Sequence, residues 1–285
     1  MMNRSAPADD VQPQAATNDV GALLREWRVV RRLSQLELAL DTGISARHLS
    51  CLETGKARPT REMVGRLADT LSVPLRERNA LLLAAGFSPE YPERPLDTPE
   101  LAPVRRAIDC ILGHQEPYPA FVLNRCWDIL RTNRAATRLR SFLGNGRSHT
   151  NMMRRFFDPN DLRAVVVNWE EVAQELIRHL HEAAAVVPSD TRTRELLEEV
   201  LRYPGVPPRW RMRELRVTPT PLLTVAFRKA RRDLCFFSTI TAFATPRDVT
   251  LDDLRIECAF PADDATAEFC RALARDEVAL DRQSG

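Results

Sequence analysis

The chain has 285 residues, of which 44% are hydrophobic and 28% are charged, and its formal net charge is +2. This length and apolar content allow two packed cores, since domains typically hold about 100 to 200 residues. No run of about 18 apolar residues occurs, and residues 1–19 lack the apolar core of a signal peptide, so we expect a cytoplasmic protein without membrane contact.

Charge is distributed unevenly along the chain. Residues 20–87 contain eleven Lys and Arg against seven Asp and Glu, a net charge of +4, and the remainder has a net charge of −2. A positive surface favours phosphate as a partner, although so small an excess is equally compatible with an ordinary solvated surface. Nucleic-acid binding, if it occurs, is therefore expected in the first part of the chain.

The order of patterns predicts two domains joined by a proline-rich segment. Residues 1–19 are rich in Ala, Pro, Asp, Asn and Gln and are expected to be a disordered tail. Helical periodicity then runs from residue 20 to residue 87. Residues 88–103 contain five prolines, which remove backbone donors and disfavour helix. They form either a semi-rigid linker or an extended arm on a neighbouring surface.

Beyond residue 104 the pattern is mixed. Segments rich in Val, Ile, Thr and Phe predict strands at 120–124, 128–132, 222–228, 234–243 and 255–260, with a hairpin loop at 229–233. Apolar periodicity predicts helices at 133–142, 169–182, 192–202 and 264–275. This order indicates an α+β domain over 104–275, with an antiparallel sheet and helices on one face, followed by a tail at 276–285.

The strongest local signal lies between residues 34 and 59. Ser34 and Glu37 have the spacing of a capping box, so a helix is expected to begin at Gln35. Its inner face is predicted to consist of Leu36, Ala39 and Leu40.

A tight turn and a second helix follow. Gly43 can take the left-handed conformation that such a turn needs, and Ile44 is the apolar residue between the two helices. Ser45 caps a helix that runs to about residue 53 and is buried through Leu49 and Leu52. This burial leaves a free face, of the kind that a recognition helix presents to the major groove, formed by Ala46, Arg47, Ser50 and Cys51.

The residue types on and around this face predict DNA contacts. Arg47 has the reach for a bidentate contact to guanine O6 and N7. Gln35, His48 and Arg58 are placed for phosphate contacts, and the helix N-terminus at Ser45 adds backbone N–H donors. Cys51 either touches a thymine methyl group or makes no contact.

The pattern Q-x-x-L-A…G-I-S…L-S-x-L-E-x-G-x-x-x-P, from Gln35 to Pro59, resembles the phage-repressor-like, XRE-type regulators. The resemblance implies a five-helix, all-α DNA-binding domain over residues 20–87. It also implies a partly buried ion pair between Arg28 and Glu53. The departures from the family pattern are Leu40, Asp41 and Cys51. An alternative is a helix-turn-helix that contacts only proteins.

No catalytic or metal motif is apparent. The sequences HExxH and GxSxG are absent, and glycines are too few for a phosphate-cradling loop. Asp252, Asp253 and Glu257 are interpreted as a helix start and a polar strand face rather than as metal ligands. The cysteines lack CxxC and CxxH spacing, so we expect buried free thiols at Cys51, Cys110, Cys126, Cys235, Cys258 and Cys270.

The second domain carries many large aromatic side chains. The stretch from Pro117 to Leu139, the run from Asn151 to Phe156, Trp169 and Trp210 are similar to the MmyB-like ligand-binding domain of bacterial regulators. The resemblance implies a PAS-like domain, and some members of that family resemble fatty-acid binders. An apolar ligand such as a fatty acid is expected against Phe121, Trp127, Trp169 and Phe236, with Arg131 or Arg155 near its carboxylate.

Together these features predict a ligand-responsive transcription regulator without a cofactor or catalytic activity. One helix-turn-helix covers a half-site, so we expect a homodimer on a palindromic double-stranded operator. Two alternatives remain at this stage. The second domain could serve only for dimerisation or protein docking, or it could be an enzyme domain that the first domain targets.

Overall fold

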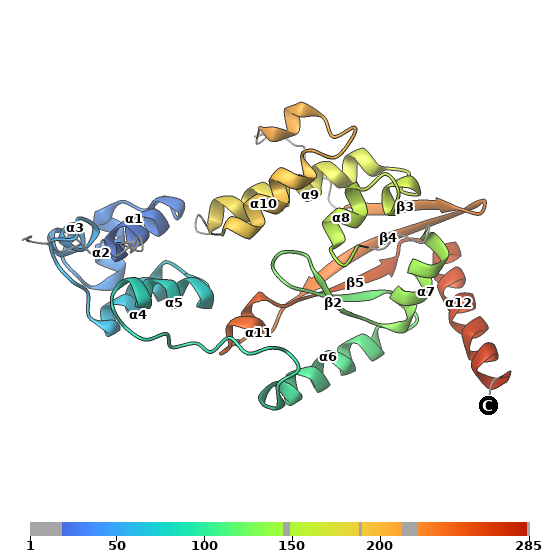
Figure 1. Ribbon diagram of the computed structural model, residues 1–285, viewed down its shortest axis with the longest axis horizontal. Coiled ribbons are helices and arrows are strands. Elements are labelled where there is room, and N and C mark those ends of the chain that lie inside the picture. Colours follow the sequence, from blue (N-terminus) through green and yellow to red (C-terminus); the bar gives the residue numbers. More distant parts are fainter. Residues whose placement is uncertain (1–18, 145–148, 188–189, 213–221, 284–285) are drawn as a thin grey trace, which may run out of the picture. The chain divides into compact units, whose positions relative to one another are not determined.

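The computed structural model describes residues 19–144, 149–187, 190–212 and 222–283, without the side chains beyond residue 275 (Figure 1). The chain divides into two compact units between Glu90 and Tyr91, and each is described separately.

The first unit consists of five helices, which confirms the all-α prediction: α1 (Val20–Val30), α2 (Gln35–Thr42), α3 (Ala46–Glu53), α4 (Arg61–Thr70) and α5 (Leu75–Ala84). The capping box is present, with the Ser34 hydroxyl accepting from Glu37 N and the Glu37 carboxylate accepting from Ser34 N. Asp19 caps α1 through Gly21 N, so this residue belongs to the folded unit and not to the predicted tail. Residues 1–18 of that tail lie outside the described residues.

The predicted inner face of α2 is wrong in two positions. Leu36 and Leu40 are 60% and 71% exposed, whereas Leu38, Ala39 and Thr42 are buried. In a helix of eight residues both sets have helical spacing, so periodicity alone does not choose between them. Thr42 tolerates burial because its hydroxyl donates to Leu38 O at 2.6 Å.

The helices α1 and α3 approach each other closely at Gly21 of α1. A Cβ atom at this position would lie 2.2 Å from the backbone oxygen of Leu52 in α3. Backbone atoms in a packed helix cannot move away cheaply, so only glycine lets α1 lie this close to α3.

The second unit is built on a five-stranded antiparallel sheet of order β2-β1-β5-β4-β3. The strands are β1 (Ala120–Leu123), β2 (Ile129–Thr132), β3 (Thr224–Lys229), β4 (Arg232–Thr241) and β5 (Arg255–Pro261). The expected α+β domain with an antiparallel sheet is thereby confirmed. The β3–β4 hairpin is tighter than predicted, because Lys229 pairs with Arg232 and only Ala230 and Arg231, both with positive φ, form the turn.

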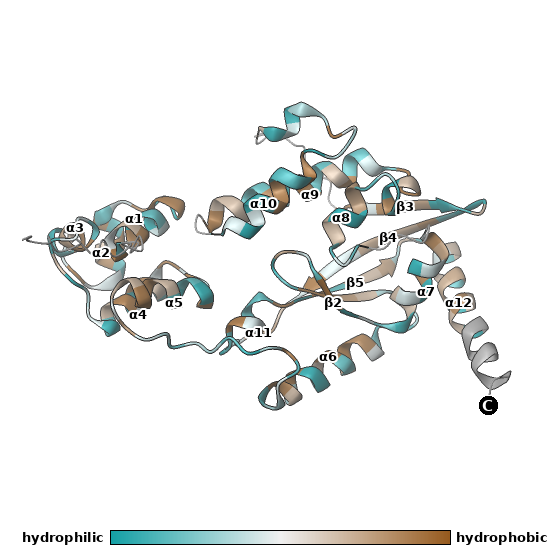
Figure 2. Cartoon of the chain, viewed as in Figure 1, coloured by the Kyte–Doolittle hydropathy of each residue, from teal (hydrophilic) through white to brown (hydrophobic). Residues whose placement is uncertain are grey.

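Helices cover both faces of this sheet, so the expectation of helices on one face is wrong. On one face lie α7 (Arg134–Leu143) and α8 (Met152–Phe157), with α9 (Trp169–Val186) and α10 (Thr191–Val200) packed against α8. On the other lies α6 (Ala102–His114), an amphipathic helix (Figure 2). It packs Ile108 and Leu112 against Val122 and Ile256. Both faces of β1 are apolar, which favours a helix on each side of the sheet.

The remaining elements complete the second unit. They are the short helices η1 (Pro99–Leu101), η2 (Leu162–Ala164), η3 (Pro208–Arg211) and α11 (Val249–Asp253), and α12 (Asp264–Gln283). The helix α12 continues past residue 275, where we expected it to end, into the predicted tail. Part of the proline-rich segment lies on α11, where Val249 N donates to Pro92 O and the Arg94 guanidinium is 3.0 Å from the Asp248 carboxylate. This is the extended-arm alternative for these residues.

The Gly21 contact gives a direct test of the helix packing. Gly21→Ala should destabilise the first unit by about 1 to 3 kcal/mol, because the added methyl group clashes with backbone. Gly65→Ala is the matched control, since Gly65 lies in α4 with open space around it and alanine favours helix. Trp27 is the only tryptophan before residue 90, so urea unfolding followed by ¹⁹F NMR of fluorotryptophan-labelled protein reports this unit. Equal stability of the two variants would contradict the packing.

Candidate functional site

The third helix has the exposed and buried faces that the sequence predicts. Ser45 caps it by accepting a hydrogen bond from His48 N at 3.1 Å. Leu49 and Leu52 are fully buried, whereas Arg47 is exposed. The other members of the predicted face are half-buried, namely Ala46, Ser50 and Cys51. Arg47 is therefore the longest side chain that this helix face offers freely to a partner.

Two of the predicted phosphate contacts are accessible. Arg58 lies exposed between α3 and α4, and His48 is half-buried near the start of α3. Gln35 differs, because its amide donates to the Glu53 carboxylate at 2.8 Å. One N–H of Gln35 is therefore engaged inside the unit, and its phosphate contact stays a prediction.

The ion pair implied for Arg28 and Glu53 is present and bidentate. Arg28 Nε and Nη2 lie 2.6 and 2.9 Å from the two Glu53 oxygens, and Nη1 donates to Leu33 O at 2.9 Å. The Glu53 side chain is 2% exposed and that of Arg28 is 12% exposed. Arginine suits this role because its planar guanidinium matches both carboxylate oxygens. The pair and Gln35 thus join α1, α2 and α3.

The surroundings of Glu53 shift its titration. Burial alone would raise the pKa of this carboxyl, but hydrogen bonds from Arg28 and Gln35, together with the guanidinium charge, outweigh it. The pKa of Glu53 therefore lies below its usual value of 4.5. The hydrogen bond to Glu53 likewise raises the pKa of Arg28, so both groups are charged at neutral pH.

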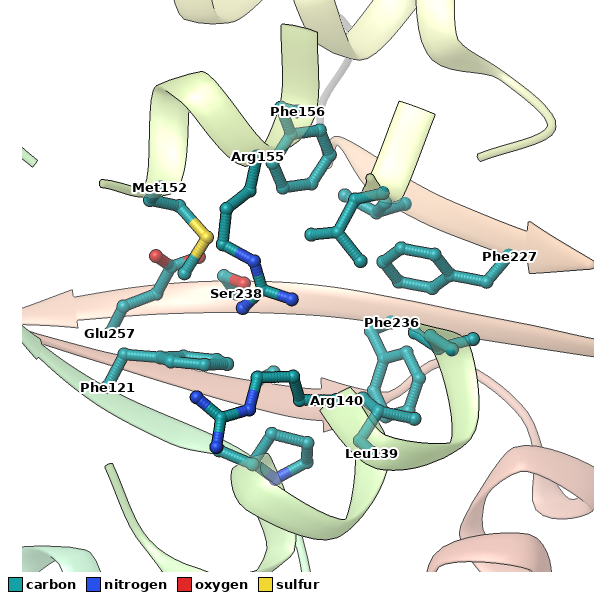
Figure 3. Close-up of a pocket in the computed structure, with 16 residues that line it drawn as sticks. Phe121, Leu139, Arg140, Met152, Arg155, Phe156, Phe227, Phe236, Ser238 and Glu257 are labelled. Atoms are coloured by element: carbon teal, nitrogen blue, oxygen red, sulfur yellow. The ribbon is translucent and has the colours of Figure 1, made fainter. Parts of the chain in front are cut away.

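The second unit contains a cavity between the sheet and the helices α7 and α8 (Figure 3). Its empty volume, including the open solvent at its mouth, is about 590 Å³. The lining is mainly apolar and comes from four strands and both helices. Its apolar members are Pro119, Phe121, Ala136, Leu139, Leu143, Met152, Phe156, Leu162, Val225, Phe227, Phe236 and Ala259.

Four polar side chains also line the cavity: Arg140, Arg155, Ser238 and Glu257. Arg155 of α8 is 3% exposed, and its guanidinium points into the cavity (Figure 3). Its Nε lies 3.4 Å from the Asp161 carboxylate, which partly compensates the buried charge. Arg140 and Ser238 are exposed, so the cavity reaches solvent beside them.

Glu257 is an unusual residue for this lining. Burial raises the pKa of its carboxyl, while a hydrogen bond with Ser238 opposes that shift. The sequence places Glu257 on a polar strand face, whereas the structure places it at the cavity (Figure 3). Asp252 lies in the first turn of the five-residue helix α11, in agreement with the expected helix start, whereas Asp253 is its last residue.

The structure brings three of the six predicted ligand contacts to this cavity: Phe121, Arg155 and Phe236. Trp127 is buried in the turn after β1, and Trp169 packs edge-on against Phe157, with its indole N–H donating to Phe156 O. Arg131 points elsewhere and pairs with Asp109 of α6 at 2.7 Å.

Sequence reasoning missed several lining residues, and one signal could have found some of them. Side chains on paired strands that share a face recur at every second residue, so Val225 and Phe227 follow from the predicted Phe236 and the register of β3 and β4. Residues from α7 and α8, such as Leu139 and Met152, carry no such signal, because their positions depend on how the helices dock.

The remaining predictions concern cysteines, metals and membranes. All six cysteines are unpaired, but only Cys126, Cys258 and Cys270 are buried, and Cys110 is exposed because it faces outward on α6. Within the described residues no group of three or more His, Cys, Asp or Glu side chains is arranged to hold a metal ion. In that same part of the chain, no helix is long and apolar enough to cross a membrane.

Comparison with known families agrees with this geometry. Residues 19–81 match the family model described as a helix-turn-helix domain, and residues 104–273 match the MmyB-like transcription regulator ligand binding domain. No curated protein matches the chain. A helix-turn-helix unit followed by a ligand-binding unit defines a DNA-binding transcription regulator, a class distinct from enzymes. Because the second match covers more than half of the sequence, the chain belongs to the family of MmyB-like transcription regulators.

The Glu53 site predicts how stability depends on pH. A carboxyl whose pKa is lowered by folding stabilises the folded state above its usual pKa of 4.5, and this contribution is lost as the pH falls through the lower folded value. Glu53→Gln should cost about 3 kcal/mol at pH 7, because it leaves the Arg28 charge without its partner. The difference from the wild type should shrink as the pH falls below 4.5.

Urea unfolding followed at Trp27 over pH 7 to pH 3 measures this dependence. Glu62→Gln, at an exposed position on α4, is the control and should change stability little at any pH. A cost of Glu53→Gln that stays constant over this range would contradict the role of the ionised carboxylate.

Proposed function

We propose that this protein is a sequence-specific transcription regulator acting in the cytoplasm, and that an apolar small molecule in the cavity of the second unit controls its DNA binding. The observation that carries the proposal is the apolar cavity into which the buried Arg155 guanidinium points. A cation in apolar surroundings is costly unless a partner compensates it, and Asp161 approaches only its Nε. A ligand such as a fatty acid would fill the apolar cavity with its chain and place its acidic group against the Arg155 guanidinium.

On the DNA side, the proposal rests on Arg47 and on the packing that presents it. Leu49 and Leu52 fix α3 in the first unit, and Ser45 leaves the helix N-terminus at the surface. We propose base recognition by Arg47, with backbone contacts from Ser45, His48, Arg58 and Gln35. Cys51, Ala46 and Ser50 complete the face turned toward the bases.

A homodimer is part of the proposal. One recognition helix reads only a half-site, and two copies on a palindromic operator place their helices about one turn of DNA apart, roughly 34 Å. The ligand then changes DNA affinity only as far as it binds one dimer geometry better than the other. A difference of about 1.4 kcal/mol in ligand binding shifts that equilibrium about ten-fold.

Arg47→Ala tests the DNA-binding surface. The loss of a bidentate base contact should weaken specific binding by about 1 to 3 kcal/mol. Non-specific affinity at low salt should change little, because it depends on the summed phosphate contacts. Arg66→Ala removes the same charge from an exposed position on α4 and is the control. Fluorescence anisotropy with selected and scrambled DNA measures both affinities, and equal losses in the two variants would contradict base recognition by Arg47.

Arg155→Met tests the cavity. Native mass spectrometry after mild extraction should show the wild type carrying a small molecule, and calorimetry with dodecanoic acid should give saturable binding that Arg155→Met weakens at least ten-fold. Arg154→Met is the matched control, because Arg154 neighbours it on α8 but pairs with Glu199 outside the cavity lining. A protein that takes up no apolar molecule would favour a second unit that only dimerises or docks a protein.

A further inference from the structure

The position of Glu257 in the sheet gives the cavity a carboxyl group in addition to the Arg155 guanidinium. On β5 its neighbours Ile256 and Cys258 face α6, so Glu257 faces the opposite side, together with Ala259. It pairs across the sheet with Phe121 of β1 and Ile240 of β4. The sheet register therefore fixes this carboxyl on the cavity wall, and a rotation away would require the strand to slip by one residue.

Arg155 approaches the cavity from the opposite wall. Figure 3 shows Arg155 descending from α8 and Glu257 rising from β5, with Ser238 beside them. Among the described residues these two opposite charges form no ion pair within 4 Å. The charged partner of Arg155 is Asp161, and the hydrogen-bond partner of Glu257 is Ser238. The Arg155 guanidinium and the Glu257 carboxyl thus lie on opposite walls of the cavity, and they do not pair with each other.

Glu257 lies at one side of the cavity in Figure 3, together with Met152 and Phe121, while Phe227 and Phe236 lie at the other. The Arg155 guanidinium and Ser238 lie between these two sides (Figure 3). Ser238 is exposed, so the cavity is open to solvent near it. An amphipathic molecule would accordingly place its chain against the phenylalanines and its head between Arg155 and Glu257.

A plain fatty acid satisfies only half of this arrangement. Its carboxylate accepts from Arg155, but it has no donor for Glu257, and two carboxylates in contact repel one another unless one binds a proton. A hydroxyl next to the acidic group removes the conflict. It donates to an ionised Glu257 and accepts from a protonated one, so it fits either state.

We propose that Glu257, oriented by Ser238, is a specificity-determining residue that recognises a hydroxyl group beside the acidic head of the ligand. The ligand class is then a hydroxylated, acidic amphipath rather than an unsubstituted fatty acid. This inference rests on the proposed function, because it requires that the cavity binds a small molecule.

The test compares two probes that differ by one hydroxyl, dodecanoic acid and 2-hydroxydodecanoic acid. The full-length wild type should bind the hydroxy acid about ten-fold more tightly in calorimetry, because a site built around a hydroxyl leaves its own polar groups unpaired with the analogue that lacks it. Glu257→Met, of similar length, should bind the two acids equally. Ser238→Ala should reduce the preference, and Glu268→Met, on the exposed surface of α12, should keep it.

The outcomes separate this inference from the function on which it rests. Equal binding of both acids by the wild type, or a preference that survives in Glu257→Met, would overturn the role of Glu257 and leave the apolar-ligand proposal standing. Binding of neither acid would overturn the apolar-ligand proposal and the inference together. If Glu257→Met does not unfold cooperatively on heating, Ser238→Ala decides the inference, and an unchanged preference in that variant overturns it.

Discussion

A buried carboxylate is stable only when hydrogen bonds and an opposite charge replace its contacts with water. In the first unit, this requirement determines how three helices meet. Glu53 is almost fully buried at the end of α3, and its oxygens are held by Arg28 of α1 and Gln35 of α2. Because the guanidinium binds both oxygens in a plane, it restricts the rotation of α3 as well as its position. The direction in which Arg47 points therefore depends on a contact made at the other end of its own helix.

In the second unit, the constraint comes from how helices pack on the sheet. Its strand β1 is apolar on both faces, and helices pack on both sides of the sheet. The side facing α7 and α8 is filled incompletely. The residues left around that space are mostly aromatic and aliphatic, and the charged exceptions are placed by regular elements rather than by loops. A cavity whose walls are a sheet and two helices keeps its shape, so its polar groups can discriminate between ligands.

The sequence predicts local features well and docking poorly. Caps, the left-handed Gly43 and the strands are set by residues near one another in the chain, and the structure contains them. The buried face of α2 depends on which neighbour it meets, so Leu36 and Leu40 could not be placed by periodicity. Trp169 was predicted to contact the ligand but packs against Phe157 and Trp210 instead. The sequence could not distinguish the two places, because a large aromatic residue suits a core as well as a ligand site. Glu257 was misread because a polar residue in a strand looks the same whether it faces solvent or a cavity.

We propose that a small molecule in the second unit changes how the first unit binds DNA. Selection of DNA from a random pool by the full-length protein, with and without a lipid extract, tests it most directly. The account predicts enrichment of a two-fold symmetric site with half-sites about one helical turn apart, and a change in that enrichment when the extract is present. Enrichment that is identical with and without the extract would contradict ligand control, and the absence of any enriched sequence would contradict specific DNA binding itself.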